Sequence, residues 1–394
     1  MVDIQEKVSL DDMWVAYQDY RRHKKNKKGA VQFECGALLK LQILCEEIEQ
    51  QRYQLRPSEC FIVRDPTLRE VFCANPRDRI VQHFVYNELN PIIEKHLVYD
   101  AANCRKGKGT DFAIKRIWCA VKRESKNGTE PADFLKADIS GFFMRINRKL
   151  LLSQILHLID TEYKGPYPQT LRYLCTLIIL TDVTKNAKRL SPIEWWDKLP
   201  QRKTLFGNPN GLPIGNICSQ LFANYYLSEL DHLMKARHRS YSRFVDDIII
   251  VDSDIEKLKK SWEILERTLS PINMELSANK TYIGNVYYGI PYLGVRIFPH
   301  YIGLGKTRIN RLWRQLKSGH MMDSPQHVWQ SAASRKGMFT RYHGYRVAKR
   351  WYDAFPSEIQ DVLMFSTKDY IVPRPAAETG NHTKTNSTKI PGSG

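Results

Sequence analysis

The 394-residue chain is longer than one compact core usually holds, so two or three packed domains are expected. Its composition, 42% hydrophobic and 26% charged, is that of a globular protein and excludes a chain that is disordered throughout. Sixty lysines and arginines against 42 aspartates and glutamates give a formal net charge of +18. Such a surplus favours a polyanionic partner, because contacts with phosphate groups release condensed counterions. A basic surface that serves only solubility is the alternative.

Membrane insertion and disulfide chemistry are not expected. No stretch approaches the roughly 18 consecutive apolar residues of a membrane span, and the first residues lack the pattern of a signal peptide. The eight cysteines are scattered, without a Cys-x-x-Cys pair, which predicts reduced thiols rather than disulfides or a zinc site. We therefore expect a cytoplasmic protein that makes no membrane contact.

The first 58 or so residues are predicted to be helical and basic. Six cationic side chains occupy the eight positions from Arg21 to Lys28, a run typical of a solvated loop or of a phosphate contact. The helical prediction rests on apolar residues at near-helical spacing, namely Leu38, Leu39, Leu41, Ile43, Leu44 and Ile48.

Alternation from Cys60 to Phe72, around a turn at Asp65-Pro66, predicts a β-hairpin, and a helix is predicted from Arg77 to Lys95. The segment 103–110 is a basic glycine loop that opens another helix, Asp111 to Lys122. Its glycines permit close backbone approach to phosphate and its lysines add charge. The ending and spacing of a P-loop are absent, so this motif is weak by itself.

The middle of the chain mixes strands and helices. The sequence predicts an apolar strand over 134–139, helices over about 147–185, and a turn at 211–215 that leads into a helix over 219–236. It then predicts a hairpin over 241–251, an amphipathic helix over 255–269, and strands over 274–276 and 292–297. Beyond about residue 305 the chain is helical, basic and aromatic, and the residues from Ala376 onward have the composition of a disordered tail.

Two adjacent aspartates carry the first chemical hypothesis. Asp246-Asp247 lies at the tip of the predicted hairpin between two apolar arms, where like charges repel unless a cation compensates them. Asp138, at the end of a separate apolar strand, is the natural third ligand. Three carboxylates in a basic protein suggest two Mg²⁺ ions, with Mn²⁺ as an alternative, and the two-metal chemistry of nucleic-acid polymerases. Strand-end carboxylates without a metal are the alternative. By contrast, Asp11-Asp12 is best explained as the start of a helix.

Five motifs in chain order resemble the palm motifs of reverse transcriptases, and residues 66–82 resemble the fingers of bacterial retroelement enzymes. The resemblance spans roughly residues 55–350. The motifs are Asp138-Ile139-Ser140-Gly141-Phe142-Phe143, Gly215 with Ser219-Gln220, Phe244-Val245-Asp246-Asp247, Asn279-Lys280 and Tyr292-Leu293-Gly294.

The second motif narrows the subtype. Most bacterial reverse transcriptases carry Gln-Gly-x-x-x-Ser-Pro, whereas this chain has Ile214-Gly215 followed by Ser219-Gln220, which is similar to diversity-generating retroelement enzymes. Phe244 stands where that family usually has tyrosine, and the chain has an extra C-terminal segment. A related reverse transcriptase of anti-phage defence is therefore the alternative.

The resemblance implies a role for each matching position. Asp138, Asp246 and Asp247 would bind the metals, and Lys280 would protonate the departing pyrophosphate. The incoming nucleotide would be bound by Arg69, Arg64, Phe143, Ile214 and Gly215, with Phe143 as the steric gate against ribonucleotides. Ordinary core packing is the alternative for Phe143, and a surface lysine for Lys280. The template and primer would contact Ser219, Gln220, Tyr292, Leu293, Gly294, Arg105, Lys106 and Lys108.

The resemblance also implies an α+β, right-hand polymerase fold with fingers, an antiparallel-sheet palm and a helical thumb. The expected boundaries are a basic helical extension over 1–58, fingers over 59–135, a palm over 136–300 with a helical insertion at about 147–207, a thumb over 301–372 and a disordered tail over 373–394.

The implied function is RNA-directed DNA synthesis on a cognate structured RNA, through an RNA–DNA duplex and dNTPs, in error-prone retrohoming. A small basic accessory protein is a further partner to consider. A non-catalytic RNA-binding scaffold and an RNA-dependent RNA polymerase are the alternatives; the three aspartates argue against the former and Phe143 against the latter.

Overall fold

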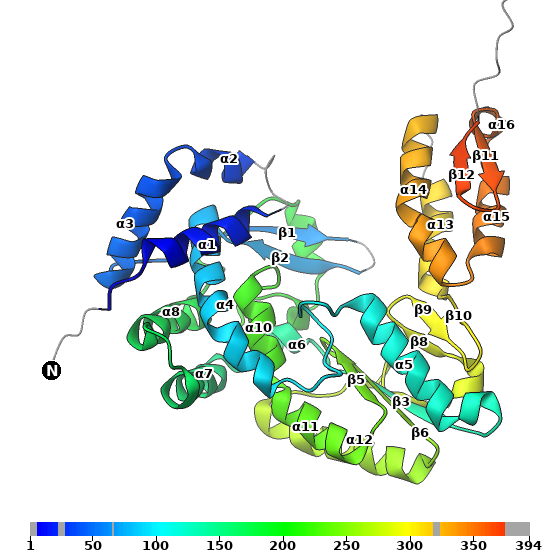
Figure 1. The fold of residues 1–394 in the computed structure, drawn as a ribbon, viewed down its shortest axis with the longest axis horizontal. Helices are drawn as coiled ribbons and strands as arrows, with labels where there is room; N and C mark the ends of the chain where they lie inside the picture. The colour runs from blue at the N-terminus through cyan, green and yellow to red at the C-terminus, as the bar shows by residue number, and fades with distance from the viewer. Residues whose placement is uncertain (1–5, 23–27, 65–66, 318–323, 375–394) are drawn as a thin grey trace, which may run out of the picture. The chain divides into compact units, whose positions relative to one another are not determined.

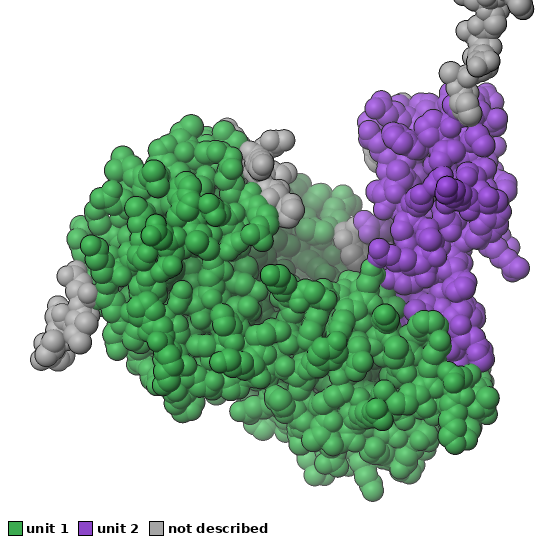
Figure 2. Space-filling view, viewed as in Figure 1, with its two compact units in different colours: residues 1–290 green, residues 291–394 purple. Residues whose placement is uncertain are grey.

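The protein folds into two compact units, residues 1–290 and 291–394, which Figure 2 shows in different colours. The computed structural model describes residues 6–22, 28–64, 67–317 and 324–374. Helices and strands are mixed in both units, so the expectation of an α+β protein is confirmed. No helix within these ranges is both long enough and apolar enough to cross a membrane.

Three helices open the chain: α1 (Leu10–Arg21), α2 (Lys28–Glu34) and α3 (Ala37–Glu49). Ser9 caps α1 by accepting hydrogen bonds from the backbone N–H groups of Asp11 and Asp12, so that aspartate pair starts a helix, as expected. The apolar face of α3 differs from the prediction. Leu41, Leu44 and Ile48 are buried, whereas Leu38, Leu39 and Ile43 are exposed, because only one side of the helix packs against the core. Residues 23–27 of the basic run lie outside the described residues.

The predicted hairpin is present as β1 (Glu59–Val63) and β2 (Arg69–Cys73), which pair antiparallel; its expected turn at 65–66 is not among the described residues. The short strand β4 (Lys188–Arg189) pairs with β1 in parallel, which the sequence analysis missed because two residues carry no periodicity. Helix α4 (Pro76–His96) follows the hairpin, with Asn75 as its N-cap and Pro76 in its first turn. Helix α5 (Thr110–Glu124) and the short η1 (Lys126–Gly128) come next.

The central element of the first unit is a four-stranded sheet in the order β5-β6-β3-β7. It is antiparallel throughout, and α5 and α12 pack against it, as Figure 1 shows. Residues 248–251 of β6 are buried on both faces, which explains their unbroken apolar run. The strands are β3 (Asp133–Asp138), β5 (Tyr241–Phe244), β6 (Asp247–Asp252) and β7 (Tyr282–Asn285).

Two sequence predictions about this region are wrong. The strand expected at 274–276 makes only one isolated bridge, Leu276 with Ile139; Met274 is drawn into the core instead, and β7 takes the edge of the sheet. The helix expected over 219–236 is interrupted at Leu227, between α10 and α11, and Leu233 is 38% exposed. The helices of this region are α6 (Phe142–Arg145), α7 (Arg148–Glu162), α8 (Pro168–Leu180), α9 (Ile193–Asp197), η2 (Gln201–Lys203), α10 (Ile217–Tyr226), α11 (Ser228–Arg237), α12 (Ile255–Leu269), η3 (Ser270–Ile272) and η4 (Val286–Tyr288).

The second unit contains β-structure that the sequence analysis did not predict. The single strand expected at 292–297 is interrupted by a turn at Leu293-Gly294, where both residues have positive φ, and the sheet order is β10-β9-β8. The segment expected to be a helical thumb ends in the hairpin β11–β12, whose Phe365 and Tyr370 pack against the core around Trp351. Its elements are β8 (Ile290–Tyr292), β9 (Val295–Ile297), β10 (Ile302–Leu304), α13 (Lys306–Lys317), α14 (Pro325–Arg341), α15 (Tyr345–Asp353), α16 (Ser357–Gln360), β11 (Leu363–Ser366) and β12 (Tyr370–Pro373).

The two remaining expectations concern the tail and the cysteines. The expectation of a disordered tail over 373–394 is wrong for its first two residues, because Pro373 belongs to β12 and the Arg374 backbone N–H donates to the Val362 carbonyl. Residues 375–394 lie outside the described residues. All eight cysteines are free thiols, which confirms the prediction of reduced cysteines.

Candidate active site

The structure brings the three predicted carboxylates together at one end of the central sheet. Asp138 ends β3 and pairs across the sheet with Asp247, the first residue of β6. The backbone N–H of Ile139 donates to the Asp246 carbonyl at 3.1 Å, which ties the tip of the β5–β6 hairpin to the end of β3. Residues 108 positions apart in the chain therefore share one site because strand register places them there.

Burial and the repulsion between neighbouring carboxylates raise the pKa values of Asp246 and Asp247. The pKa of Asp246 rises to about 6, first because the group is buried and then because Asp138 and Asp247 are near. Burial also raises the pKa of Asp247, while Lys136 opposes that rise. The folded site thus holds the Asp246 proton more tightly than water does, and the ionised form carries an energetic cost there.

Two lysines supply positive charge next to the carboxylates. The Lys280 ammonium lies 2.9 Å from both carboxylate oxygens of Asp138, so the structure places this predicted residue inside the site. Lys136 Nζ lies 3.4 Å from Asp247 Oδ1, a neighbour that the sequence analysis missed. The two-residue period of β3, which puts Lys136 and Asp138 on one face of the sheet, was the signal that could have identified it.

The donor set fits divalent cations. Asp247 Oδ1 is buried, and the Lys136 ammonium lies 3.4 Å from it. Among the described residues, no group of three histidine, cysteine, aspartate or glutamate side chains is arranged so that it could hold a metal ion by itself. Oxygen donors alone suit Mg²⁺, which takes further ligands from water and substrate phosphates. Asp138, Asp246 and Asp247 are the residues that would hold the ions.

A buried ion pair between Arg243 and Asp231 stabilises the β5–β6 hairpin. The sequence analysis did not predict this pair. Arg243 on β5, 1% exposed, makes two hydrogen bonds to the Asp231 carboxylate, at 2.7 and 2.6 Å. Its Nη1 also donates to the Val245 carbonyl at 3.0 Å. Val245 has φ = 60°, a strained conformation for a β-branched residue. Arg243 therefore fixes the turn that carries Asp246.

The loop at 211–215 meets strand β2. The Phe72 backbone N–H donates to the Ile214 carbonyl at 2.8 Å. Gly215 has φ = +118°, and a Cβ atom there would lie 2.4 Å from the Phe72 carbonyl oxygen. The position therefore needs glycine, for its backbone conformation and for this close approach.

Replacing Gly215 with alanine is expected to separate the loop from β2. Strain and the clash with Phe72 together should cost about 1–3 kcal/mol of unfolding free energy, measured by urea denaturation. Gly36→Ala is the matched control, because Gly36 also has positive φ but a Cβ there would meet no atom within 4 Å. Equal destabilisation by both changes would show that backbone strain alone matters.

Of three further nucleotide-site candidates, Phe143 lies next to this loop, Arg69 begins β2 and Arg64 directly follows β1. The Phe143 carbonyl accepts a hydrogen bond from the Leu212 N–H at 2.8 Å, and the half-buried Phe143 ring meets Phe142 edge-on. Arg69 is exposed at the start of β2. Arg64 is also exposed, and its guanidinium lies over the Trp195 ring at 4.6 Å.

The template candidates on α10 anchor the basic glycine loop. Ser219 is buried, and the Gln220 side-chain oxygen accepts a hydrogen bond from Asn103 at 2.9 Å. The backbone carbonyl of Asn103 accepts a hydrogen bond from the Asn224 side chain at 2.8 Å. The loop at 103–110 is thus held against α10, and its exposed residues are the ones open to a partner.

Only one of the three cations predicted in this loop is open to a partner. The Arg105 side chain is 6% exposed and donates to Glu94 and to the carbonyls of Val98 and Ala101, so its contacts favour a structural role over template binding. Lys108 donates to the Tyr99 carbonyl at 2.7 Å, and its pKa falls to about 8, mainly because it is buried. Lys106 is exposed.

The candidates Tyr292, Leu293 and Gly294 lie in the second unit, at the β8–β9 turn. Tyr292 is 1% exposed, and the Leu293 carbonyl accepts a hydrogen bond from Arg308 at 2.8 Å. The Arg308 side chain also packs over Gly294, where a Cβ atom would lie 2.4 Å from its Nε.

The sequence model of the family "Reverse transcriptase (RNA-dependent DNA polymerase)" matches residues 64–297, which is more than half of the chain. The chain therefore belongs to the reverse transcriptase family and contains an RNA-dependent DNA polymerase domain. The matched residues include Asp138, Asp246, Asp247 and Lys280 and extend to the end of β9. This confirms the resemblance at the level of the family.

A comparison with curated proteins found no match. Among solved structures, the chain is similar to apo telomerase from Candida tropicalis (14% identity, 76% of this chain and 58% of that chain, TM-score 0.45). It is also similar to telomerase from Candida albicans in complex with a fragment of telomeric RNA (14% identity, 79% and 61%, TM-score 0.42). The chain thus spans about three fifths of the length of these telomerase chains.

Proposed function

We propose that this protein is an RNA-directed DNA polymerase that extends a primer by two-metal nucleotidyl transfer. The observation that carries the proposal is the meeting of Asp138, Asp246 and Asp247 at one end of the central sheet, with a pKa of about 6 at Asp246. Repelling carboxylates of this kind are stabilised by cations and suit positively charged catalytic ions. The net charge of +18 favours an RNA or RNA–DNA partner.

The side chains around the carboxylates have distinct proposed roles. Two divalent ions, when bound, would make the primer 3′-hydroxyl more acidic and stabilise the leaving pyrophosphate. Lys280 holds its proton next to Asp138 and would donate it to the pyrophosphate. Arg69, exposed on β2, would contact the triphosphate. In this proposal residues 59–135 act as fingers, 136–300 as palm and 301–372 as thumb.

Primer extension on an RNA template tests the proposal. With Mg²⁺ and dNTPs, the wild-type chain should synthesise DNA, and the Asp246→Ala/Asp247→Ala variant should not. The double variant should still bind the template, because it loses negative charge only. Synthesis by the variant at the wild-type rate would overturn the proposal. A wild-type chain inactive on a generic template is tested again with RNA that co-purifies from the native host.

Phe143 is proposed to select deoxyribonucleotides, because its half-buried ring lies next to the loop that carries Ile214 and Gly215. Phe143→Ala should relax sugar discrimination by roughly 10- to 100-fold, since a removed clash of this kind is worth about 1–3 kcal/mol. The ratio of kcat/KM for dNTPs and rNTPs measures it. Phe142→Ala is the control, because that ring is buried in the core; it should lower stability without changing the ratio.

We further propose that synthesis is error-prone and serves a diversity-generating retroelement. The aliphatic Ile214 offers no hydrogen-bonding group where most bacterial relatives have glutamine, which loosens geometric control over the template base. Errors concentrated at template adenines, and restored accuracy in Ile214→Gln, would support this role. Accurate copying by the wild-type chain would favour the alternative, a defence-associated reverse transcriptase that uses a non-coding RNA. A structured template RNA, a small basic accessory protein and a cytoplasmic location belong to the same proposal.

A further inference from the structure

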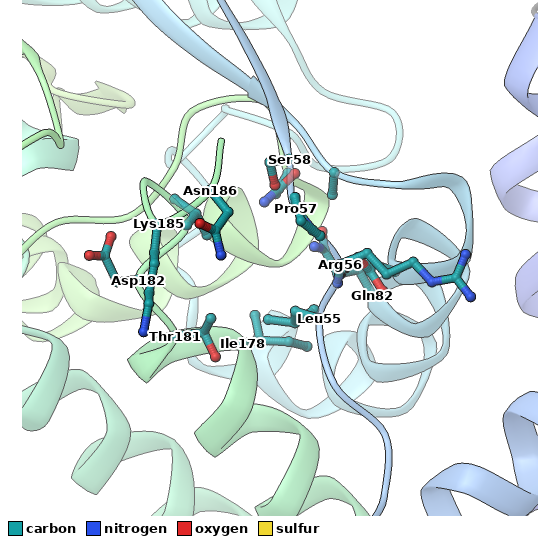
Figure 3. Close-up of a pocket in the computed structure, with 14 residues that line it drawn as sticks. Leu55, Arg56, Pro57, Ser58, Gln82, Ile178, Thr181, Asp182, Lys185 and Asn186 are labelled. Carbon is teal, nitrogen blue, oxygen red and sulfur yellow. Dashed lines mark hydrogen bonds between the residues drawn. The ribbon is translucent and has the colours of Figure 1, made fainter. Parts of the chain in front are cut away.

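A second polar cavity lies in the first unit, apart from the three carboxylates. It has a volume of about 260 Å³ and is bounded by residues 55–58, the start of α4, residues 178–186 and Asn216. Figure 3 shows Leu55 and Ile178 on one side of the cavity and Pro57 and Ser58 on the other. Its volume lies just below the range of drug-sized ligand sites, about 300–1,000 Å³, so it suits a single heterocyclic ring.

The side chains of two buried residues, Gln82 and Asn216, each carrying a carboxamide, line this cavity. Asn216 is 6% exposed and its Oδ1 makes no hydrogen bond to any described residue. Gln82, on helix α4, is 3% exposed and lines the same cavity, and its backbone carbonyl accepts a hydrogen bond from Cys218. A buried amide oxygen that lacks a hydrogen bond destabilises the fold. The unpaired Asn216 oxygen and the Gln82 amide on one cavity indicate that the cavity takes a ligand with matching donors and acceptors.

The position of Asn216 at the start of α10 gives a second reason to expect a ligand for its side chain. Asn216 is the N-cap residue of α10, yet its side chain makes no capping hydrogen bond, although asparagine is among the best N-cap residues. The side chain lines the cavity instead. Asn216 also directly follows Ile214 and Gly215, so the cavity adjoins the loop proposed to bind the incoming nucleotide.

The remaining walls suit the faces and the phosphates of a nucleotide. Leu55, Pro57 and Ile178 offer apolar surface on which an aromatic ring can pack. Arg56 and Lys185 flank the cavity from opposite sides, as Figure 3 shows, and both are exposed. Two carboxylates, Asp78 and Asp182, also line the cavity and balance the two cations. Both are already hydrogen-bonded, Asp78 by Tyr53 and the Arg56 backbone N–H and Asp182 by Thr184.

We propose that this cavity binds an unpaired nucleobase of the RNA strand, read by the amides of Gln82 and Asn216. The inference rests on the proposed function, because it takes RNA as the partner. Amide side chains pair with the hydrogen-bonding edges of bases, and RNA-binding proteins commonly hold splayed-out bases in this way. A base held here would fix the position of the template strand relative to the nucleotide-binding loop.

The test is a double-mutant cycle between protein and RNA. A fluorescently labelled RNA of mixed sequence, prepared with a single abasic site at each position in turn, is titrated with the full chain. For the wild-type chain, one abasic position should weaken binding on the order of 10-fold, as expected for one recognised base. For Gln82→Met, the same abasic site should change binding less than about twofold.

Gln154→Met is the matched control, because Gln154 Oε1 is also buried without a hydrogen bond but does not line the cavity. It should retain the full effect of the abasic site, and melting curves confirm that both variants fold. Equal abasic effects in the wild-type chain and Gln82→Met would overturn the proposal. The wild-type chain could instead bind free adenosine or guanosine saturably, lose this binding in Gln82→Met, and show no abasic effect. That result would overturn the assignment of the cavity to the RNA strand.

The test is independent of catalysis, so the two proposals can fail separately. The titration is repeated with Asp246→Ala/Asp247→Ala, which should show the same abasic effect as the wild-type chain. An abasic effect without DNA synthesis would overturn the polymerase proposal alone. DNA synthesis without any abasic effect would overturn the base-binding cavity alone.

Discussion

Asp246→Asn is expected to lower primer extension by at least about 10³-fold, because a catalytic ion supplies several kcal/mol of transition-state stabilisation. The same change is expected to stabilise the metal-free protein. The pKa of Asp246 rises from 3.8 to about 6 on folding, so the ionised group opposes folding at neutral pH. Removing its charge should add roughly 1–3 kcal/mol to the unfolding free energy, measured by urea denaturation in EDTA.

The sign of the pH dependence follows from the raised pKa. The folded state holds the Asp246 proton more tightly than the unfolded state, so the wild-type protein loses this stability as the pH rises from about 4 to about 6. The difference between Asp246→Asn and the wild type should therefore be small near pH 4 and reach its full size above pH 6. Asp254→Asn is the control: Asp254 caps α12, and asparagine caps equally well. A destabilised Asp246→Asn protein would contradict this account of the site.

Asp231→Ala is expected to be the most destabilising of the substitutions considered, at about 3–5 kcal/mol, because it leaves the Arg243 guanidinium buried and unpaired. Asp231 is 0% exposed and Arg243 is 1% exposed. Arg243 also donates a hydrogen bond to the Val245 carbonyl in the turn that carries Asp246. Urea denaturation measures the loss. Asp160→Ala is the control, because the Asp160–Arg172 pair is exposed and should contribute no more than about 1 kcal/mol.

Replacing both partners separates stability from positioning. Asp231→Leu with Arg243→Met removes the buried charges together and should recover much of the lost stability. Primer extension should remain low, because the Val245 carbonyl loses the hydrogen bond from Arg243 that fixes the turn. Full activity in this double variant would show that the ion pair contributes only to stability and not to the position of Asp246.

Several features followed from the amino-acid sequence because they depend on neighbouring residues. The β1–β2 hairpin, helix α4 with its proline in the first turn, helix α12 from Ile255 to Leu269 and the β5–β6 hairpin each carry their pattern within one short segment. The position of Asp246-Asp247 between two apolar arms indicated a charged site for the same reason. Membership of the reverse transcriptase family was also recognisable from short motifs in the right order.

Other features depended on contacts between distant segments. The local pattern predicted a strand at 274–276, but the edge of β3 pairs with residues 282–285, which the sequence analysis did not predict as a strand. The hairpin β11–β12 followed from packing of its aromatic residues around Trp351, and α10 and α11 separated at a break that no glycine or proline marks.

Within the candidate site, the sequence by itself determined the residue types: three aspartates, a lysine and a glycine in family order. Only the tertiary structure decided what surrounds them, because burial and pairing depend on residues far apart in the chain. The fold places Lys136 next to Asp247 and pairs the buried Arg243 with Asp231. It also pairs Arg105 with Glu94, so that this cation has a structural partner. It also brought Gln82 and Asn216 to one cavity, 134 positions apart in the chain. The motifs in the sequence identify the ionisable residues, whereas burial and pairing in the folded chain set their pKa values and determine which of them remain available to a ligand.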